Sequence, residues 1–325
     1  MSRAIIALAS LTFILSTTPT PAQDWPNRPM TMVVPFAAGG AVDVLGRTLA
    51  ARAAEILGQQ IVIENIGGAG GMTGANRVAK GVPDGHLFVL GSVGTHAQNQ
   101  TLYKNPAYDA AKDFEPVILV AEVPLLLVTR KDFPADNLQE FIAYSKANQG
   151  KLQFGSAGTG SAVHLGCVLL NAAIGAQATH IPYRGGGPAM QDLVAGRIDY
   201  TCNIITSALP QVKQSQIKAM ANLSPKRAPL LPDLRTSQEQ GLAGFDAATW
   251  NMVLLPKGTP EPIVRKLNAA ISEAMDSPET QKRLWSQGID IPGKDRRTPA
   301  YAAKFVQSEI KKYEAPIKAS GLVIE

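Results

Sequence analysis

The chain has 325 residues, of which 45% are hydrophobic and 6% aromatic. This length suits one large domain or two ordinary ones, and the composition excludes a fibrous or disordered protein. The 31 basic and 26 acidic side chains give a formal net charge of +5. The basic residues are scattered and not interleaved with aromatics, which argues against a nucleic-acid partner.

The N-terminus has the pattern of a secretory signal peptide over residues 1–22. Arg3 precedes the apolar run AIIALASLTFIL, and Thr20 and Ala22 are small residues placed for a cut after Ala22. The apolar run is shorter than the ~20 residues that a membrane-spanning helix needs. We therefore expect an exported, periplasmic protein.

Strands and helices are expected to alternate along the chain. The apolar run 30–36 predicts a buried strand, and a helix ended by Gly58 follows, with apolar residues at helical spacing at Val42, Leu45, Leu49 and Ile56. Further strands are expected at 60–65, 86–92, 123–130, 152–156, 179–183, 198–205 and 217–223. This alternation favours a parallel sheet covered by helices. Three C-terminal helices are expected to begin at N-caps Thr259, Ser277 and Thr298, each followed by Pro at the first helical position.

Two strand–loop–helix units, at 31–57 and 152–174, contain loops rich in Gly and Ala. A helix N-terminus carries unpaired backbone N–H groups and about half a positive charge, and small residues let an anion reach that backbone. The pair of loops therefore predicts two anion-binding cradles facing a cleft. The alternative is that the glycines only form turns between strand and helix.

No catalytic, metal or cofactor motif is present. The histidines His86, His96, His164 and His180 have no metal-binding spacing, no Ser lies in G-x-S-x-G, and no P-loop Lys follows a Gly run. We expect no cofactor, no metal and no enzymatic activity. His164, in the first turn of the second cradle helix, can either donate to an anion or pack the loop. Cys167 and Cys202 can form a disulfide or remain buried free thiols.

The segments WPNRPMTMVVPFAAGGAVDVLGRTLA, ENIGGAGGMTGANRVAKGVPDGHLF, FGSAGTGSAVHLG and IPYRGGGPAMQDLVAGRIDY resemble the Bug family, the periplasmic solute-binding proteins of tripartite tricarboxylate transporters. The resemblance covers essentially the whole mature chain. It implies an α/β periplasmic-binding-protein fold of type II, with two lobes and a ligand cleft between them. We expect crossovers near Pro124 and near 222–230, so that lobe 1 comprises 24–124 and 231–325, and lobe 2 comprises 125–230.

The resemblance also implies a set of ligand-binding residues. It places Phe36, Ala37, Gly39, Gly40 and Asp43 on one side, Ser156, Thr159, Gly160, Ser161 and His164 on the other, Ser92, Thr95 and His96 along the cleft, and Tyr183 and Asn203 at the distal end. Asp43 is expected to accept backbone N–H groups in the first helical turn and to hold its loop in shape. Asn203 stands where many relatives are expected to carry an acid, which disfavours ligands with an ammonium group.

The function implied is non-covalent capture of a small organic carboxylate, a di- or tricarboxylate or an aromatic acid. Hinge closure and delivery to a two-component membrane permease would follow, with the protein acting as a monomer. Two alternatives are a sensory receptor for the same ligands and, less favoured, an exported α/β enzyme.

Overall fold

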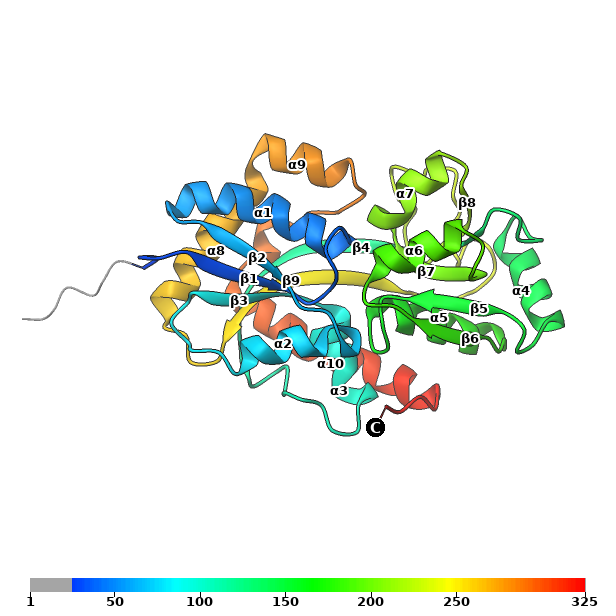
Figure 1. The fold of residues 1–325 in the computed structure, drawn as a ribbon, viewed down its shortest axis with the longest axis horizontal. Coiled ribbons are helices and arrows are strands. Elements are labelled where there is room, and N and C mark those ends of the chain that lie inside the picture. Colours follow the sequence, from blue (N-terminus) through cyan, green and yellow to red (C-terminus); the bar gives the residue numbers. More distant parts are fainter. Residues whose placement is uncertain (1–24, 325) are drawn as a thin grey trace, which may run out of the picture.

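The computed structural model describes residues 25–324, so the expected signal peptide at 1–22 lies outside the described residues. Within 25–324, no helix combines the length and the apolar character needed to cross a bilayer. The strands form a twisted sheet in the order β2-β1-β3-β9-β4-β7-β5-β6, with β8 added beside β4. Figure 1 shows the described chain as two α/β lobes, joined by long strands that run between them.

The first lobe is built on strands β1 (Met30–Val34), β2 (Ile61–Asn65) and β3 (Leu87–Ser92). They pair in parallel, with β1 in the middle. β1 and β3 are almost fully buried, as expected for strands covered on both faces.

Two long strands tie the lobes together. β4 (Phe114–Arg130) pairs through its first part with β9 (Ala248–Pro256) and through its last part with β7 (Tyr200–Ile204) and β8 (Ile217–Asn222). β9 also pairs with β3. All of these pairings are antiparallel, so the expected parallel sheet is wrong at its centre. No strand was expected at β9, although it lies in the middle of the sheet.

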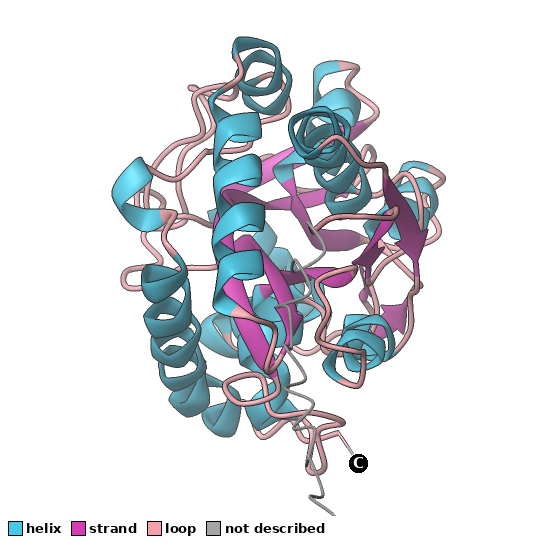
Figure 2. Cartoon of the chain, turned by 90° about the vertical axis from the view of Figure 1, so that its left-hand side faces the viewer, coloured by secondary structure: helices cyan, strands magenta, loops and turns pink. Residues whose placement is uncertain are grey.

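The second lobe adds β5 (Gln153–Ser156) and β6 (Thr179–Pro182), which pair in parallel with each other, and β5 also meets β7 in parallel. Its helices are α4 (Leu138–Ala147), α5 (Ala162–Ile174), α6 (Gly186–Val194) and α7 (Ile205–Lys213). Figure 2, which looks along the long axis of the molecule, shows helices outside the strands.

Helices of the first lobe come from both ends of the chain. They are α1 (Ala41–Leu57), α2 (Met72–Ala79), α3 (Asn99–Leu102), α8 (Glu261–Asp276), α9 (Pro278–Trp285) and α10 (Pro299–Ala319), with short helical turns at Ala69–Gly71, Gly94–Gln98 and Lys294–Arg296. α1 ends at Gly58 in the left-handed conformation (φ 69°), as its sequence predicts. Thr298 caps α10 through a hydrogen bond from the Tyr301 N–H, but α8 begins after Pro260, and the Thr259 hydroxyl donates to the Pro256 carbonyl instead.

The chain enters the second lobe along β4, where Val123 and Pro124 are the last residues paired with β9. The segment 223–247 packs on the second lobe: Phe245 and Ala247 join its core, and the Ala247 N–H donates to the Leu223 carbonyl. These contacts favour a return to the first lobe near Ala248 rather than at 222–230. The exact limits of the lobes stay a prediction.

Candidate functional site

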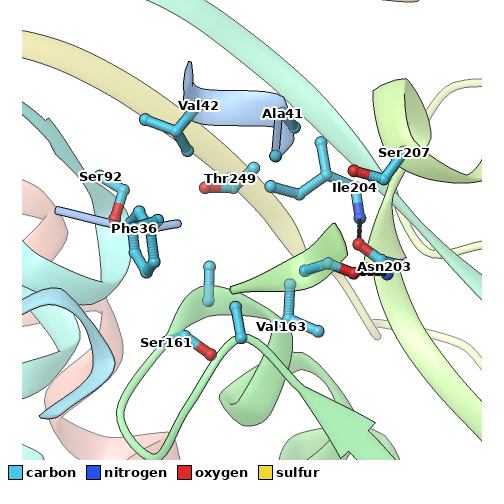
Figure 3. Close-up of a pocket in the computed structure, with 14 residues that line it drawn as sticks. Phe36, Ala41, Val42, Ser92, Ser161, Val163, Asn203, Ile204, Ser207 and Thr249 are labelled. Carbon is cyan, nitrogen blue, oxygen red and sulfur yellow. Dashed lines mark hydrogen bonds between the residues drawn. The ribbon is translucent and has the colours of Figure 1, made fainter. Parts of the chain in front are cut away.

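A pocket lies where the two lobes meet, with about 430 Å³ of space between its walls, part of it open to solvent. Both lobes line it, as Figure 3 shows. The first lobe contributes Phe36, Gly40, Ala41, Val42, Ser92 and Thr249, and the second contributes Ala157, Ser161, Ala162, Val163, Gly186, Asn203, Ile204 and Ser207. All fourteen residues are neutral, so the groups of this lining that can face a charged ligand are backbone dipoles and uncharged polar side chains.

The N-terminus of α1 forms one wall of the pocket. Gly40 is the N-cap residue, and the first hydrogen bond of the helix runs from the Val44 N–H to the Gly40 carbonyl at 3.0 Å. The N–H groups of Ala41 and Val42 precede that bond and have no partner within the helix. They are therefore donors at the positive end of a 17-residue helix.

The N-terminus of α5 forms the opposite wall. Ser161 is its N-cap, and the Ser161 hydroxyl oxygen accepts the His164 N–H at 3.2 Å. The next turn begins with the bond from the Leu165 N–H to the Ser161 carbonyl. The N–H groups of Ala162 and Val163 therefore have no partner within the helix, and both residues line the pocket together with Ala41 and Val42 of α1.

Two further helices begin at the same pocket. Gly186 is the first residue of α6, while Ile204 is the N-cap residue of α7 and Ser207 lies in its first turn. Asn203 lies between them: its side-chain oxygen accepts the Ile204 N–H at 2.9 Å, and its side-chain nitrogen is 3.5 Å from the Gly186 carbonyl. Four helix N-termini therefore converge on a pocket without charged side chains, which makes the pocket favourable for an anion.

Asp43 holds the first cradle loop, as expected, but the backbone N–H that it accepts lies before α1 and not in its first turn. Its carboxylate accepts the Gly39 N–H, the Arg47 side chain and the Asn65 amide, each at 2.9 Å, and the Asn65 amide also donates to the Phe36 carbonyl. Burial raises the pKa of Asp43, but these hydrogen bonds outweigh burial and leave the pKa below its usual range. Asp43 itself does not line the pocket, and Arg47 neutralises it.

The structure brings only five of the fifteen expected residues to the pocket surface: Phe36, Gly40, Ser92, Ser161 and Asn203. Ala37 is a contact between the lobes, because its N–H donates to the Arg184 carbonyl at 3.2 Å. Tyr183 points elsewhere and donates to Asp192 at 2.7 Å. Thr95 accepts the Ser92 N–H and contacts His96, which is fully buried among Tyr108 and Phe114.

The remaining expected residues of the second cradle support the loop from behind. Ser156 accepts the Gly158 N–H and contacts the His180 imidazole at 2.6 Å. The Gly160 N–H donates to Nδ1 of His164 at 3.2 Å, and the His164 ring lies 4.1 Å from that of His180. Thr159 and His164 line a separate hollow beside Ser320 and Leu322. Of the two possibilities for His164, its position favours packing the loop.

Burial lowers the pKa of His164 to about 3 and that of His180 to about 4, and the neighbouring His180 contributes to the shift at His164. Both rings are therefore neutral at pH 7. A neutral His164 can accept the Gly160 N–H through Nδ1, and this hydrogen bond fixes the loop that leads into α5.

Several pocket residues were missed by sequence reasoning. Ala41, Val42, Ala162 and Val163 are the first residues of the two cradle helices; counting helical positions rather than loop glycines would have found them. Thr249 lies on the unassigned strand β9, whose run TWNMVLLP was the available signal. The packing of α6 and α7 decides whether their first residues line the pocket, and no local sequence pattern indicates this packing. These residues are Gly186, Ile204 and Ser207.

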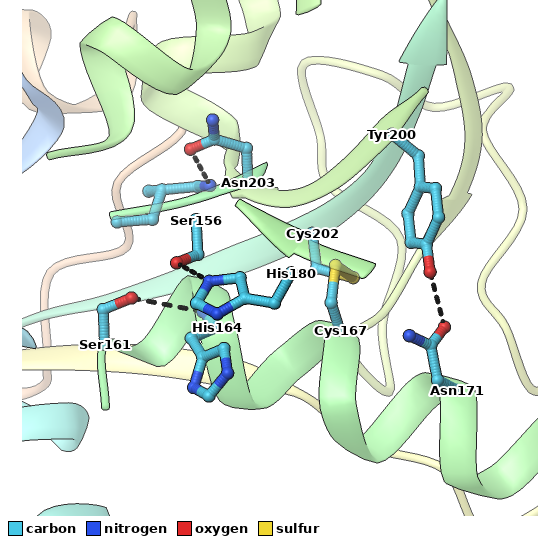
Figure 4. The surroundings of a disulfide bond; sticks show 10 residues. Ser156, Ser161, His164, Cys167, Asn171, His180, Tyr200, Cys202 and Asn203 are labelled. Atoms are coloured by element: carbon cyan, nitrogen blue, oxygen red, sulfur yellow. Dashed lines mark hydrogen bonds between the residues drawn. A yellow bond between two sulfur atoms is a disulfide. The ribbon is translucent and has the colours of Figure 1, made fainter. Parts of the chain in front are cut away.

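Cys167 of α5 and Cys202 of β7 are joined in a disulfide, with their Cα atoms 5.3 Å apart. The bond links the second cradle helix to the strand that carries Asn203, as Figure 4 shows. Within residues 25–324, no group of three His, Cys, Asp or Glu side chains is placed to hold a metal ion.

Comparison with known proteins identifies the class. Residues 45–322 match the family described as "Tripartite tricarboxylate transporter family receptor", and the chain belongs to that family. It is a solute-binding protein with the two-lobed fold of periplasmic binding proteins, and the resemblance to the Bug family is confirmed.

Three solved structures are particularly similar. MatC from Rhodopseudomonas palustris with bound malate is 42% identical, with 90% of this chain and 100% of MatC covered and a TM-score of 0.88. The periplasmic binding protein BugD is 37% identical, with coverage of 93% and 100% and a TM-score of 0.89. An R. palustris protein solved with adipate is 36% identical, with coverage of 92% and 99% and a TM-score of 0.88.

Proposed function

We propose that this protein captures a small organic carboxylate in the pocket between its lobes and delivers it to a two-component membrane permease. The observation that carries the proposal is the convergence of the α1 and α5 N-termini on a pocket lined only by neutral residues. The N–H groups of Ala41, Val42, Ala162 and Val163 would bind the carboxylate, with the Ser161 hydroxyl beside them.

The similar proteins with malate and adipate support this ligand class. The neutral Asn203 amide supports ligands without an ammonium group, because an amide compensates a buried positive charge less well than a carboxylate does. Asp43, Thr95, Ser156 and His164 would act indirectly, by holding the loops that carry the N–H donors.

Contacts across the pocket rim support capture by closure. The Ala37 N–H bonds the Arg184 carbonyl, the Tyr103 hydroxyl bonds the Thr159 carbonyl at 3.2 Å, and the Thr206 hydroxyl bonds the Gln287 carbonyl at 3.1 Å. Each joins one lobe to the other. A closed form of this kind would release the ligand only after hinge opening, which the permease would favour on docking in the periplasm.

The first test is native mass spectrometry of the protein purified without denaturation, followed by a thermal-shift screen of organic acids and calorimetry on the hits. We expect one class of carboxylate to raise the melting temperature and to be recovered chemically unchanged. Light scattering is expected to show a monomer with and without ligand. Chemical turnover of the acid would favour the enzymatic alternative. If no di-, tri- or aromatic carboxylate binds, the proposed function is overturned.

A further inference from the structure

We infer that Ser92 and Thr249 form a neutral hydroxyl pair that selects carboxylates bearing a hydroxyl group on their carbon chain. The inference rests on the proposed function, because it names a chemical feature of the ligand in the same pocket. Ser92 ends β3 and Thr249 lies near the start of β9, so both belong to the part of the sheet where the lobes join.

The register of the sheet places Ser92 and Thr249 on the same face, as diagonal neighbours. Ser92 lies opposite Asn251 in the antiparallel β3–β9 pair, and Thr249 is two residues from Asn251 on the same face. Diagonal neighbours of this kind lie about 7–8 Å apart at Cα and somewhat less at Cβ. One ligand oxygen within hydrogen-bond distance of both hydroxyls needs them about 5.5 Å apart, which this arrangement allows.

Both hydroxyls are buried and available. Ser92 is 3% exposed and Thr249 is 2% exposed, and both side chains line the pocket. The Ser92 hydroxyl has only a long contact of 3.5 Å, to Thr95, whose own hydroxyl already bonds the Ser92 backbone. Within residues 25–324, the Thr249 hydroxyl makes no hydrogen bond. Both oxygens face the pocket, so a ligand without a hydroxyl there would cover them and leave them without a partner, whereas a ligand hydroxyl can bond to them.

The position of Thr249 is fixed by its pairing with β4 and by the contacts of its neighbour Trp250. Its backbone pairs with Val123 of β4, and the next residue, Trp250, points to the other face and donates to Glu309 at 2.8 Å. The backbone that carries the hydroxyl is therefore fixed and does not shift to fit the ligand. A fixed polar group that is unpaired in the absence of its partner is the usual basis of discrimination against an analogue that lacks the matching group.

The pocket contains two kinds of polar group: backbone N–H groups and side-chain hydroxyls. Backbone N–H donors at the helix N-termini suit charged oxygens, whereas a hydroxyl both donates and accepts and so suits a second hydroxyl. Phe36, Val42 and Ile204 supply apolar surface near Thr249, as Figure 3 shows, and this surface suits the hydrocarbon part of the ligand. A hydroxy acid matches all three features.

The test compares pairs of acids that differ by one hydroxyl: malate with succinate, citrate with tricarballylate, and mandelate with phenylacetate. Calorimetry on the wild type is expected to show tighter binding, by about tenfold, of the hydroxylated member of whichever pair binds. Thr249→Val keeps the side-chain shape and removes the hydroxyl. It is expected to abolish most of that preference while the affinity for the deoxy acid changes less than about twofold. Ser92→Ala should reduce the preference in the same direction.

Thr201→Val is the matched control, because Thr201 is a fully buried Thr with an unpartnered hydroxyl on β7, outside the pocket lining. This variant should keep the wild-type preference. Equal affinities within the binding pair, or an equal loss for both acids in Thr249→Val, would overturn the inference while leaving the proposed function intact. Failure of every acid to bind would instead overturn the proposed function, and the inference with it.

Discussion

Tyr103 of the first lobe donates its phenolic hydrogen to the backbone carbonyl oxygen of Thr159 in the second lobe, at 3.2 Å. Thr159 lies in the loop that leads to the α5 N-terminus. This hydrogen bond therefore connects the first lobe directly to the loop of the second cradle. Gly160 shows how tightly the surfaces meet: a Cβ there would lie 2.5 Å from the Asn99 side-chain oxygen.

Removing this contact should weaken the closed form. Tyr103→Phe is expected to lower ligand affinity about 2- to 10-fold, mainly through faster dissociation, because one hydrogen bond between the lobes is lost. Stopped-flow and calorimetry would measure the effect. Tyr144→Phe, in α4 away from the pocket, should behave as wild type. An unchanged dissociation rate in Tyr103→Phe would show that the contact does not contribute to closure.

The Gly40→Val variant tests whether the ligand carboxylate approaches the backbone of the first cradle. Gly40 has φ −76°, which any residue adopts, and a Cβ there meets only the Ala37 carbonyl oxygen, at 3.4 Å. We therefore expect normal folding and a loss of affinity of at least about tenfold, since the side chain would hold the carboxylate away from the α1 N–H groups. Ala51→Val is the control, because Ala51 is an exposed residue of the same helix and lies outside the pocket lining. Full affinity in Gly40→Val would contradict the cradle.

Stability should fall as the pH falls below about 6.5. Burial lowers the pKa of His96 and that of His164 to about 3 from 6.5. Between those values the unfolded chain binds protons that the native protein does not, so acid favours unfolding. We expect the free energy of unfolding to drop by about 1 to 2 kcal/mol per histidine between pH 7.5 and pH 5. Urea titrations at several pH values would measure this.

His164→Asn should make that dependence on pH shallower, because an Asn side-chain oxygen can still accept the Gly160 N–H but does not titrate in this range. An identical slope in wild type and variant would show that His164 is not a source of the acid sensitivity.

The disulfide is expected to stabilise the second lobe. Cys167 and Cys202 are separated by 35 residues, and closing a loop of that length in the unfolded chain corresponds to about 3–4 kcal/mol. Thermal melts with and without reductant should differ accordingly, and a Cys167→Ala, Cys202→Ala double variant should melt like the reduced protein. No response of the wild type to a reductant that fully reduces the unfolded chain would argue against the bond.

Much of the local structure follows from the sequence alone. The α1 helix, its end at Gly58 and the strands around both cradle loops were predictable, because apolar periodicity and glycine at a left-handed position act over a few neighbouring residues. The role of Asp43 was predictable for the same reason, since the Gly39 N–H that it accepts lies four residues away.

Tertiary structure decided what surrounds the ligand. β9 enters the sheet between β3 and β4 and carries Thr249 into the pocket, yet Ser92 and its partner Asn251 are far apart in the sequence. The N-termini of α6 and α7 reach the pocket only because β7 packs against β4. Such pairings depend on contacts over long stretches of chain, which no local pattern encodes. The sequence by itself therefore determined the two Gly-rich loops and the helices that follow them, and the packing of the lobes decided which side chains line the pocket.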